Sequence, residues 1–188
     1  MAPLYTLPVI HDPSTNVVIS NSIDIARYLD VTYPSTTQLF PPNSNALLES
    51  FPEIPSLGAG LMPIVAPLIC TYLNPTSTEY YRRTRELSLG SKLEDLSPPG
   101  GPLRDQHWQQ VQSGYGAINA WLAKNGEGKK FVMGDVMSYA DVVIVGWVLF
   151  IKLMLGMQSQ EWKEIEGWHD GRWAAFLTEF TDYLVVVE

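Results

Sequence analysis

The first third of the chain begins with two short runs of apolar residues separated by polar ones. Residues 4–10 predict a strand, residues 11–16 have the composition of a turn, and residues 17–19 predict a second strand. The short separation predicts an antiparallel hairpin. Ile25 and Leu29 follow at a spacing of four, which places both on one buried face of a helix.

The predicted helix has recognisable boundaries. Asn21 is a favourable N-cap residue, and Asp24 follows three positions later, as in a capping box. We expect the helix to end near Tyr33, because a residue that precedes proline is disfavoured in the helical conformation. The first element group is therefore strand, strand and helix.

The rest of the chain predicts helices. Residues 34–45 are polar and rich in proline, which is typical of a linker. Residues 45–72 are apolar, but four prolines interrupt them, so we expect kinks or breaks. Helical periodicity continues in the segments 78–96, 103–124, 138–157, 161–168 and 171–183. The pattern predicts a mainly α protein: a strand-strand-helix unit, a linker and an all-helical domain.

Charge and composition exclude several classes of function. The 188 residues include 12 Lys plus Arg and 20 Asp plus Glu, a formal net charge of −8. This balance argues against a nucleic-acid binder or a polybasic membrane-surface protein. The longest apolar run, residues 142–151, is shorter than the ~20 residues of a membrane span. The single cysteine, Cys70, cannot form an internal disulfide and fits a reducing compartment, so we expect a cytoplasmic protein. We expect no metal site, because His11, His107, His169 and Cys70 lack the spacing of metal ligands.

One candidate binding site lies in the first unit. Pro8 in a strand is ordinarily an edge feature, and Asn21 with Ser22 ordinarily forms a helix cap. A cis bond at Pro8 would instead turn the backbone of Leu7 toward an added peptide strand. The Ser22 hydroxyl and the amides at the helix start would bind a carboxylate. Both interpretations remain open from the residues alone.

Two further groups of residues have simpler interpretations. Ser138 and Asp141 have the spacing of a capping box before an apolar run, and we interpret them as a structural cap. A stripe of apolar residues consists of Met62, Val65, Ile69 and Tyr72. These residues would either line a pocket for an acceptor substrate or belong to the core, and we favour the core.

The order of these motifs resembles a known family. Residues 6–10 and 18–29 resemble the second half of the thioredoxin-like domain of a glutathione transferase. Residues 134–141 resemble the capping motif of the helical domain of that family. The segments 75–86 and 162–173 resemble a fungal, etherase-like (UstS-like) branch similar to the bacterial β-etherases.

The resemblance implies a domain organisation. Residues 1–33 would form part of a thioredoxin-like, glutathione-binding domain, residues 34–45 a linker, and residues 46–188 the all-helical C-terminal domain. The implied fold class is a truncated thioredoxin-like ββα unit followed by an all-helical glutathione-transferase domain. A small hydrophobic electrophile and a second copy of the chain, in a homodimer, are the other implied partners.

The resemblance also implies the roles of single residues. Pro8 would be the cis-proline, and the backbone of Leu7 would pair with the cysteinyl part of glutathione, the co-substrate. Asn21 and Ser22 would hold the γ-glutamyl carboxylate. Asn21 stands where the family usually has an acidic residue or glutamine, so a charge for the γ-glutamyl ammonium is missing at this position.

The catalytic residue of the family has no expected counterpart. The Ser, Tyr or Cys that activates the thiol belongs to a strand-helix-strand-helix segment, and seven residues before Pro8 are too few for a βαβ unit of about 30 residues. We therefore expect conjugation or cleavage of small electrophiles with glutathione if that segment is supplied. The alternatives are a non-catalytic binding or interaction protein with this fold, or a truncated gene model.

Overall fold

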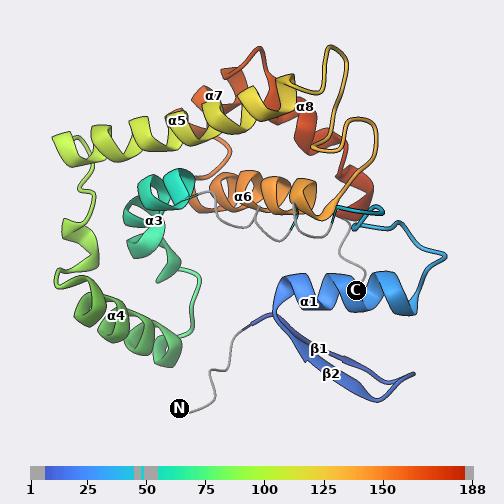
Figure 1. The fold of residues 1–188 in the computed structure, drawn as a ribbon. Coiled ribbons are helices and arrows are strands. Elements are labelled where there is room, and N and C mark those ends of the chain that lie inside the picture. The colour runs from blue at the N-terminus through green and yellow to red at the C-terminus, as the bar shows by residue number, and fades with distance from the viewer. Residues whose placement is uncertain (1–6, 45–47, 49–54, 185–188) are drawn as a thin grey trace. The chain divides into compact units, whose positions relative to one another are not determined.

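The protein consists of two compact units in the computed structural model, which describes residues 7–44, 48 and 55–184 (Figure 1). The first unit combines residues 1–53 with residues 128–144, and the remainder of the chain forms the second. Helices predominate, and the described residues contain one two-stranded sheet. The predicted fold class, mainly α with a short ββα unit, is confirmed.

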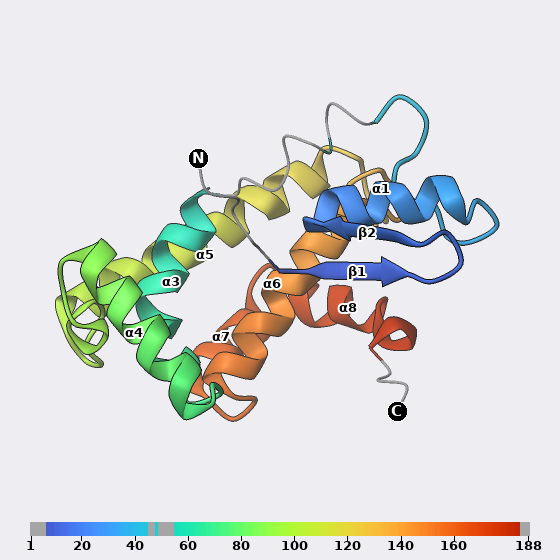
Figure 2. The same cartoon turned by 90° about the horizontal axis from the view of Figure 1, so that it is seen from below.

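The first unit begins with the expected hairpin. Strands β1 (Val9–Asp12) and β2 (Val17–Ser20) are antiparallel, with Val9 opposite Ser20. Helix α1 (Ser22–Thr32) lies alongside the hairpin (Figures 1 and 2). The first strand extends to Asp12, two residues beyond the predicted end, and the predicted strand residues 4–6 lie outside the described residues.

Asp12 explains why the strand continues into the predicted turn. Its carboxylate accepts hydrogen bonds from the Ser14 backbone N–H at 2.9 Å and from the phenols of Tyr28 and Tyr33 at 2.6 Å each. These hydrogen bonds, led by the one from Tyr28, hold the pKa of Asp12 well below its usual range. One carboxylate therefore attaches the turn of the hairpin to the second half of α1.

The core of the first unit joins segments far apart in the sequence. Ala26 of α1 packs with Leu48, Tyr139 and Ala140. The buried carboxylate of Asp30 accepts hydrogen bonds at 2.8 Å from two consecutive backbone N–H groups of the following loop, and so ties this loop to α1. The partly buried residues around this core are Ile23, Leu39, Phe40, Val132 and Val143.

The described residues of the second unit form helices joined by turns and loops, with no strand among them. Helix α6 (Tyr139–Leu155) begins in the first unit and continues into the second. The other elements are α3 (Pro55–Ile69), α4 (Pro75–Leu89), η1 (Leu93–Asp95), α5 (Pro102–Ala123), α7 (Gln160–Gly167), α8 (Arg172–Thr178) and η2 (Thr181–Tyr183).

Two helices differ from the sequence prediction. Helix α3 continues through Pro63 and Pro67, so the expected break is absent there, while a kink stays a prediction. The two prolines are four residues apart, so both missing N–H groups lie on one side of the helix, which can continue around them. Helix α4 ends at Leu89 and not at residue 96, because Gly90 adopts a left-handed conformation with φ of 67° and caps the helix.

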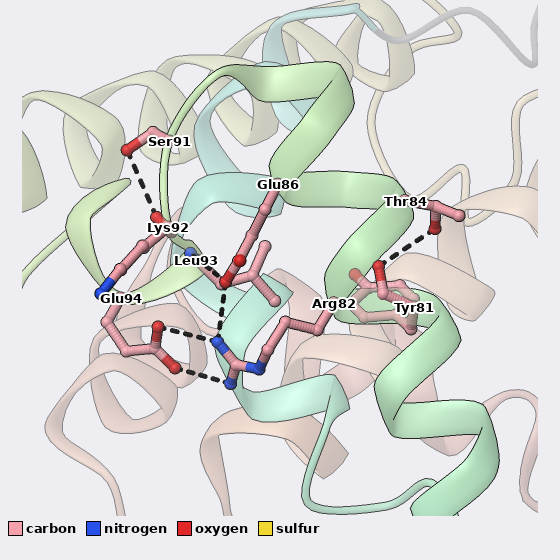
Figure 3. A network of polar contacts seen from close by, with 8 residues as sticks. All are labelled: Tyr81, Arg82, Thr84, Glu86, Ser91, Lys92, Leu93 and Glu94. Carbon is pink, nitrogen blue, oxygen red and sulfur yellow. Dashed lines mark hydrogen bonds and ion pairs between the residues drawn. The ribbon is translucent and has the colours of Figure 1, made fainter.

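An ion-pair network connects the end of α4 to η1 (Figure 3). The Arg82 guanidinium donates to both carboxylate oxygens of Glu94, at 2.9 and 2.7 Å, and to Glu86 at 2.9 Å. The hydrogen bonds from Arg82 lower the pKa of Glu94. The groups are largely exposed, so we expect each pair to contribute less than about 1 kcal/mol.

Helices α3 and α5 approach each other closely at two glycines. A Cβ at Gly60 would lie 2.5 Å from the His107 carbonyl oxygen, and one at Gly114 would lie 3.0 Å from the Leu57 backbone nitrogen. Both helices therefore depend on glycine at the crossing. The fully buried side chains of this unit include Leu57, Leu61, Val65, Leu93, Val111, Tyr115, Ile151 and Trp173.

Candidate glutathione site

The candidate site forms where the start of β1 meets the start of α1. The Leu7–Pro8 peptide bond is cis, the conformation that the family resemblance implies. The Pro8 carbonyl accepts a hydrogen bond of 3.2 Å from the Asn21 backbone N–H. This bond brings Leu7 and Pro8 together with Asn21 and Ser22, which are remote in sequence.

No described residue pairs with the backbone of Leu7. Leu7 is 89% exposed, and within residues 7–44, 48 and 55–184 nothing forms a hydrogen bond with its N–H or its C=O. Strand pairing starts only at Val9. An extended peptide could therefore pair with Leu7 as an added strand does.

The start of α1 differs from the predicted cap. Asn21 occupies the predicted N-cap position, which is confirmed, but its side chain accepts no hydrogen bond from the helix, so the expected capping hydrogen bond is absent. Asn21 has a left-handed backbone (φ 78°), and its Nδ2 donates to the Asp24 carboxylate at 3.0 Å. Among the described residues, no group accepts from the first three amides of α1 (residues 22–24). These amides carry the positive end of the helix dipole.

Ser22 has a partner that local sequence reasoning missed. Its hydroxyl lies 2.9 Å from the phenol oxygen of Tyr139, which is 117 positions further along the chain. Ser22 is exposed, whereas Tyr139 is buried at the start of α6. No local pattern around either residue could have indicated this pair.

The residues interpreted as a structural cap lie in the same part of the unit. Asp141 accepts hydrogen bonds of 2.8 Å from the backbone N–H and the hydroxyl of Ser138, and another of 2.8 Å from the Val132 backbone N–H. Burial raises the pKa of Asp141, although these hydrogen bonds oppose the shift. The Ser138 hydroxyl donates to Asp141 and does not accept from its amide, which differs from a standard capping box.

The four residues considered for an acceptor pocket lie in different environments. Val65 is fully buried, Met62 and Tyr72 are exposed, and Ile69 is intermediate. The Tyr72 phenol donates to the Leu153 carbonyl at 2.9 Å. A cavity of about 630 Å³ in the second unit is lined by residues of α6, α7 and α8, by Gly156 and Met157, and by Thr181 and Leu184, and none of the four lines it. Their role in an acceptor site stays a prediction.

Neither a cluster of metal-binding side chains nor a helix that could span a membrane occurs in residues 7–44, 48 and 55–184. No group of three or more His, Cys, Asp or Glu side chains there is placed to hold a metal ion. No helix among them is both long enough and apolar enough to span a membrane.

Comparison with known proteins identifies the family. Residues 52–183 match the family model of the glutathione S-transferase C-terminal domain. The chain belongs to the glutathione S-transferase family. This confirms the family resemblance, while the etherase-like branch and the predicted boundaries of its domains stay predictions.

Solved structures of fungal glutathione transferases are similar over nearly the whole chain. A glutathione S-transferase of Ceriporiopsis subvermispora, in complex with glutathione, is 48% identical over 99% of this chain and 74% of its own, with a TM-score of 0.95. A second one from that fungus, also with glutathione, is 38% identical over 96% and 72%, with a TM-score of 0.88. A glutathione transferase of Phanerochaete chrysosporium is 37% identical over 98% and 73%, with a TM-score of 0.90. A search of curated proteins gave no match.

Proposed function

We propose that this chain binds glutathione through Leu7, Pro8, Asn21 and Ser22. Two similar fungal transferases are solved with glutathione, and this supports the choice of ligand. The observation that carries the proposal is the hydrogen bond from the Asn21 N–H to the Pro8 carbonyl, which places an open backbone segment beside an open helix start.

Two parts of the tripeptide, the cysteinyl and the γ-glutamyl residues, have proposed partners. The N–H and C=O of Leu7 pair with the cysteinyl residue, as in strand addition. The Ser22 hydroxyl and the amides at the start of α1 hold the γ-glutamyl carboxylate, which the helix dipole attracts. Asp24, bonded to Asn21 at 3.0 Å, supplies the negative charge near the γ-glutamyl ammonium that Asn21 itself lacks.

The proposed reaction is the transfer of glutathione to a small hydrophobic electrophile, or the cleavage of such an electrophile by glutathione. The glutathione thiol loses its proton, its sulfur forms a bond to the electrophilic carbon, and a leaving group departs with its bonding electron pair. A donor that stabilises the thiolate lowers the pKa of the thiol. We assign no residue of this chain to that role, so turnover requires a donor such as the one in the N-terminal segment of the family.

The location and the assembly are also proposals. We propose a cytoplasmic protein, supported by the single cysteine Cys70. We propose a homodimer, supported by β1, which pairs only with β2 among the described residues and so has one open edge.

The proposal is tested by calorimetric titration of the whole chain with glutathione. Ser22→Ala should weaken binding about 10- to 100-fold, the effect of losing a hydrogen bond to a charged group. Ser113→Ala, at an exposed serine of α5, is the matched control and should leave the affinity unchanged. If the wild-type chain does not bind glutathione, the proposed site is wrong. Binding without turnover over a panel of electrophiles would exclude catalysis by this chain alone.

A further inference from the structure

Tyr139, the partner of Ser22, is buried and is held by contacts with Leu39 and Phe40. Tyr139 is 5% exposed, and its phenol oxygen lies 2.9 Å from the Ser22 hydroxyl. Its backbone N–H donates to the Leu39 carbonyl at 2.8 Å, and its ring stacks on Phe40 with 5.4 Å between centroids and 18° between planes. The phenol therefore has a fixed position toward Ser22.

Two hydroxyl groups at this distance share one hydrogen bond, and either group can be the donor. A carboxylate only accepts hydrogen bonds. If Ser22 donated its proton to Tyr139, its lone pairs would face the anion and repel it. If Tyr139 donates to Ser22, the serine proton is free to point toward the carboxylate.

We propose that Tyr139 is a positioning residue that fixes Ser22 as the hydrogen-bond donor to the γ-glutamyl carboxylate. The inference rests on the proposed glutathione site and adds a preference for the kind of ligand that this site binds. Because the phenol acts only through Ser22, it should favour ligands with a carboxylate at this position. Hydrogen bonds in such a chain polarise one another, which strengthens the bond at the charged end.

The structure separates this role from a structural one. Among the described residues, the Tyr139 phenol has no hydrogen-bond partner other than Ser22. Phenylalanine would keep the ring, its stacking on Phe40 and the backbone bond to Leu39. The change Tyr139→Phe therefore removes only the donation to Ser22.

The experiment compares two ligands by calorimetry with the whole chain: glutathione and 4-aminobutanoyl-cysteinyl-glycine, which lacks the γ-glutamyl carboxylate. Tyr139→Phe should weaken glutathione about 2- to 10-fold, the range for one neutral hydrogen bond, and leave the analogue unchanged. Tyr80→Phe, at an exposed tyrosine of α4, is the matched control and should change neither affinity. In the background of Ser22→Ala, Tyr139→Phe should have no further effect.

Three results would overturn the inference. They are an unchanged glutathione affinity in Tyr139→Phe, an equal loss for both ligands, and an undiminished effect in the Ser22→Ala background. Failure of the wild-type chain to bind glutathione would instead overturn the proposed function, and the inference with it.

A measurement on the wild-type chain does not depend on whether the variant folds. With carbon-13 at tyrosine Cζ, the Tyr139 resonance should shift when glutathione is added and stay unchanged with the analogue. Equal shifts with both ligands would contradict the inference.

Discussion

The crossing of α3 and α5 gives a sharp test of the packing in the second unit. In Gly60→Ala, the added methyl group would lie 2.5 Å from the His107 carbonyl oxygen and 2.9 Å from the Val111 backbone nitrogen. Both are backbone atoms of α5, so neither can rotate away. The two helices must move apart or deform to accommodate the methyl group.

The magnitude follows from two opposing effects. Alanine is more favourable than glycine inside a helix by about 1 kcal/mol. Overpacking of a close-packed contact costs about 1–3 kcal/mol, and more where a backbone must shift. Since three contacts would fall below 3.0 Å, two of them to backbone atoms, we expect the clash to dominate and Gly60→Ala to lower the free energy of unfolding by about 2 kcal/mol.

Gly58 of the same helix is the matched control. The nearest atom to a Cβ there is Cη2 of Trp147 at 4.0 Å, an ordinary contact, so Gly58→Ala should stabilise the protein by about 0.5–1 kcal/mol. Urea unfolding followed by circular dichroism measures the free energy of unfolding of both variants. In thermal unfolding, their melting temperatures should differ by about 5–10 °C. If Gly60→Ala were as stable as Gly58→Ala, the close approach of α3 and α5 would be wrong.

Three further predictions concern charged or titratable groups. The depressed pKa of Asp12 means that its stabilisation is complete above about pH 4 and lost as the pH falls through the folded-state value. Asp12→Asn should therefore flatten the acid side of a plot of unfolding free energy against pH, and the exposed Asp105→Asn should not. Asp141→Ala leaves two backbone N–H groups without their acceptor and should cost about 3 kcal/mol in urea unfolding; a cost below about 1 kcal/mol would contradict the described cap. Burial lowers the pKa of His169, whose Nδ1 accepts a hydrogen bond from Trp173 Nε1, so the stability of the protein should fall as the pH decreases below about 6.5. In thermal scans at a series of pH values, His169→Asn should lose this part of the pH dependence. The control variant His11→Asn, at an exposed histidine, should retain it.

The sequence predicts the order of the elements better than their ends. The spacing of apolar residues located the hairpin, α1 and the helices of the second unit, because each pattern is set by neighbours within a few residues. The end of α4 was placed seven residues too late, since the left-handed conformation of Gly90 stops the helix while the periodicity continues. Asn21 takes the predicted N-cap position, but its side chain bonds to Asp24 and forms no capping hydrogen bond.

The sequence predicts only part of the candidate site. Leu7, Pro8, Asn21 and Ser22 were proposed together from their motifs and a family resemblance, and the hydrogen bond between Asn21 and Pro8 brings them together. The pairing of Ser22 with Tyr139 spans 117 positions. Such a contact depends on the folded core, so no rule based on local spacing could predict it.

The composition of the first unit has a consequence for synthesis on the ribosome. Tyr139 and Ala140, which complete the core around Ala26, are translated more than 100 residues after the ββα segment. An isolated two-stranded hairpin is at best marginally stable, and Ala26 of α1 lacks two of its core partners until Tyr139 and Ala140 are made. At about 5–20 residues per second, the nascent segment therefore spends several seconds with its apolar face exposed, and this interval is when a chaperone would bind it.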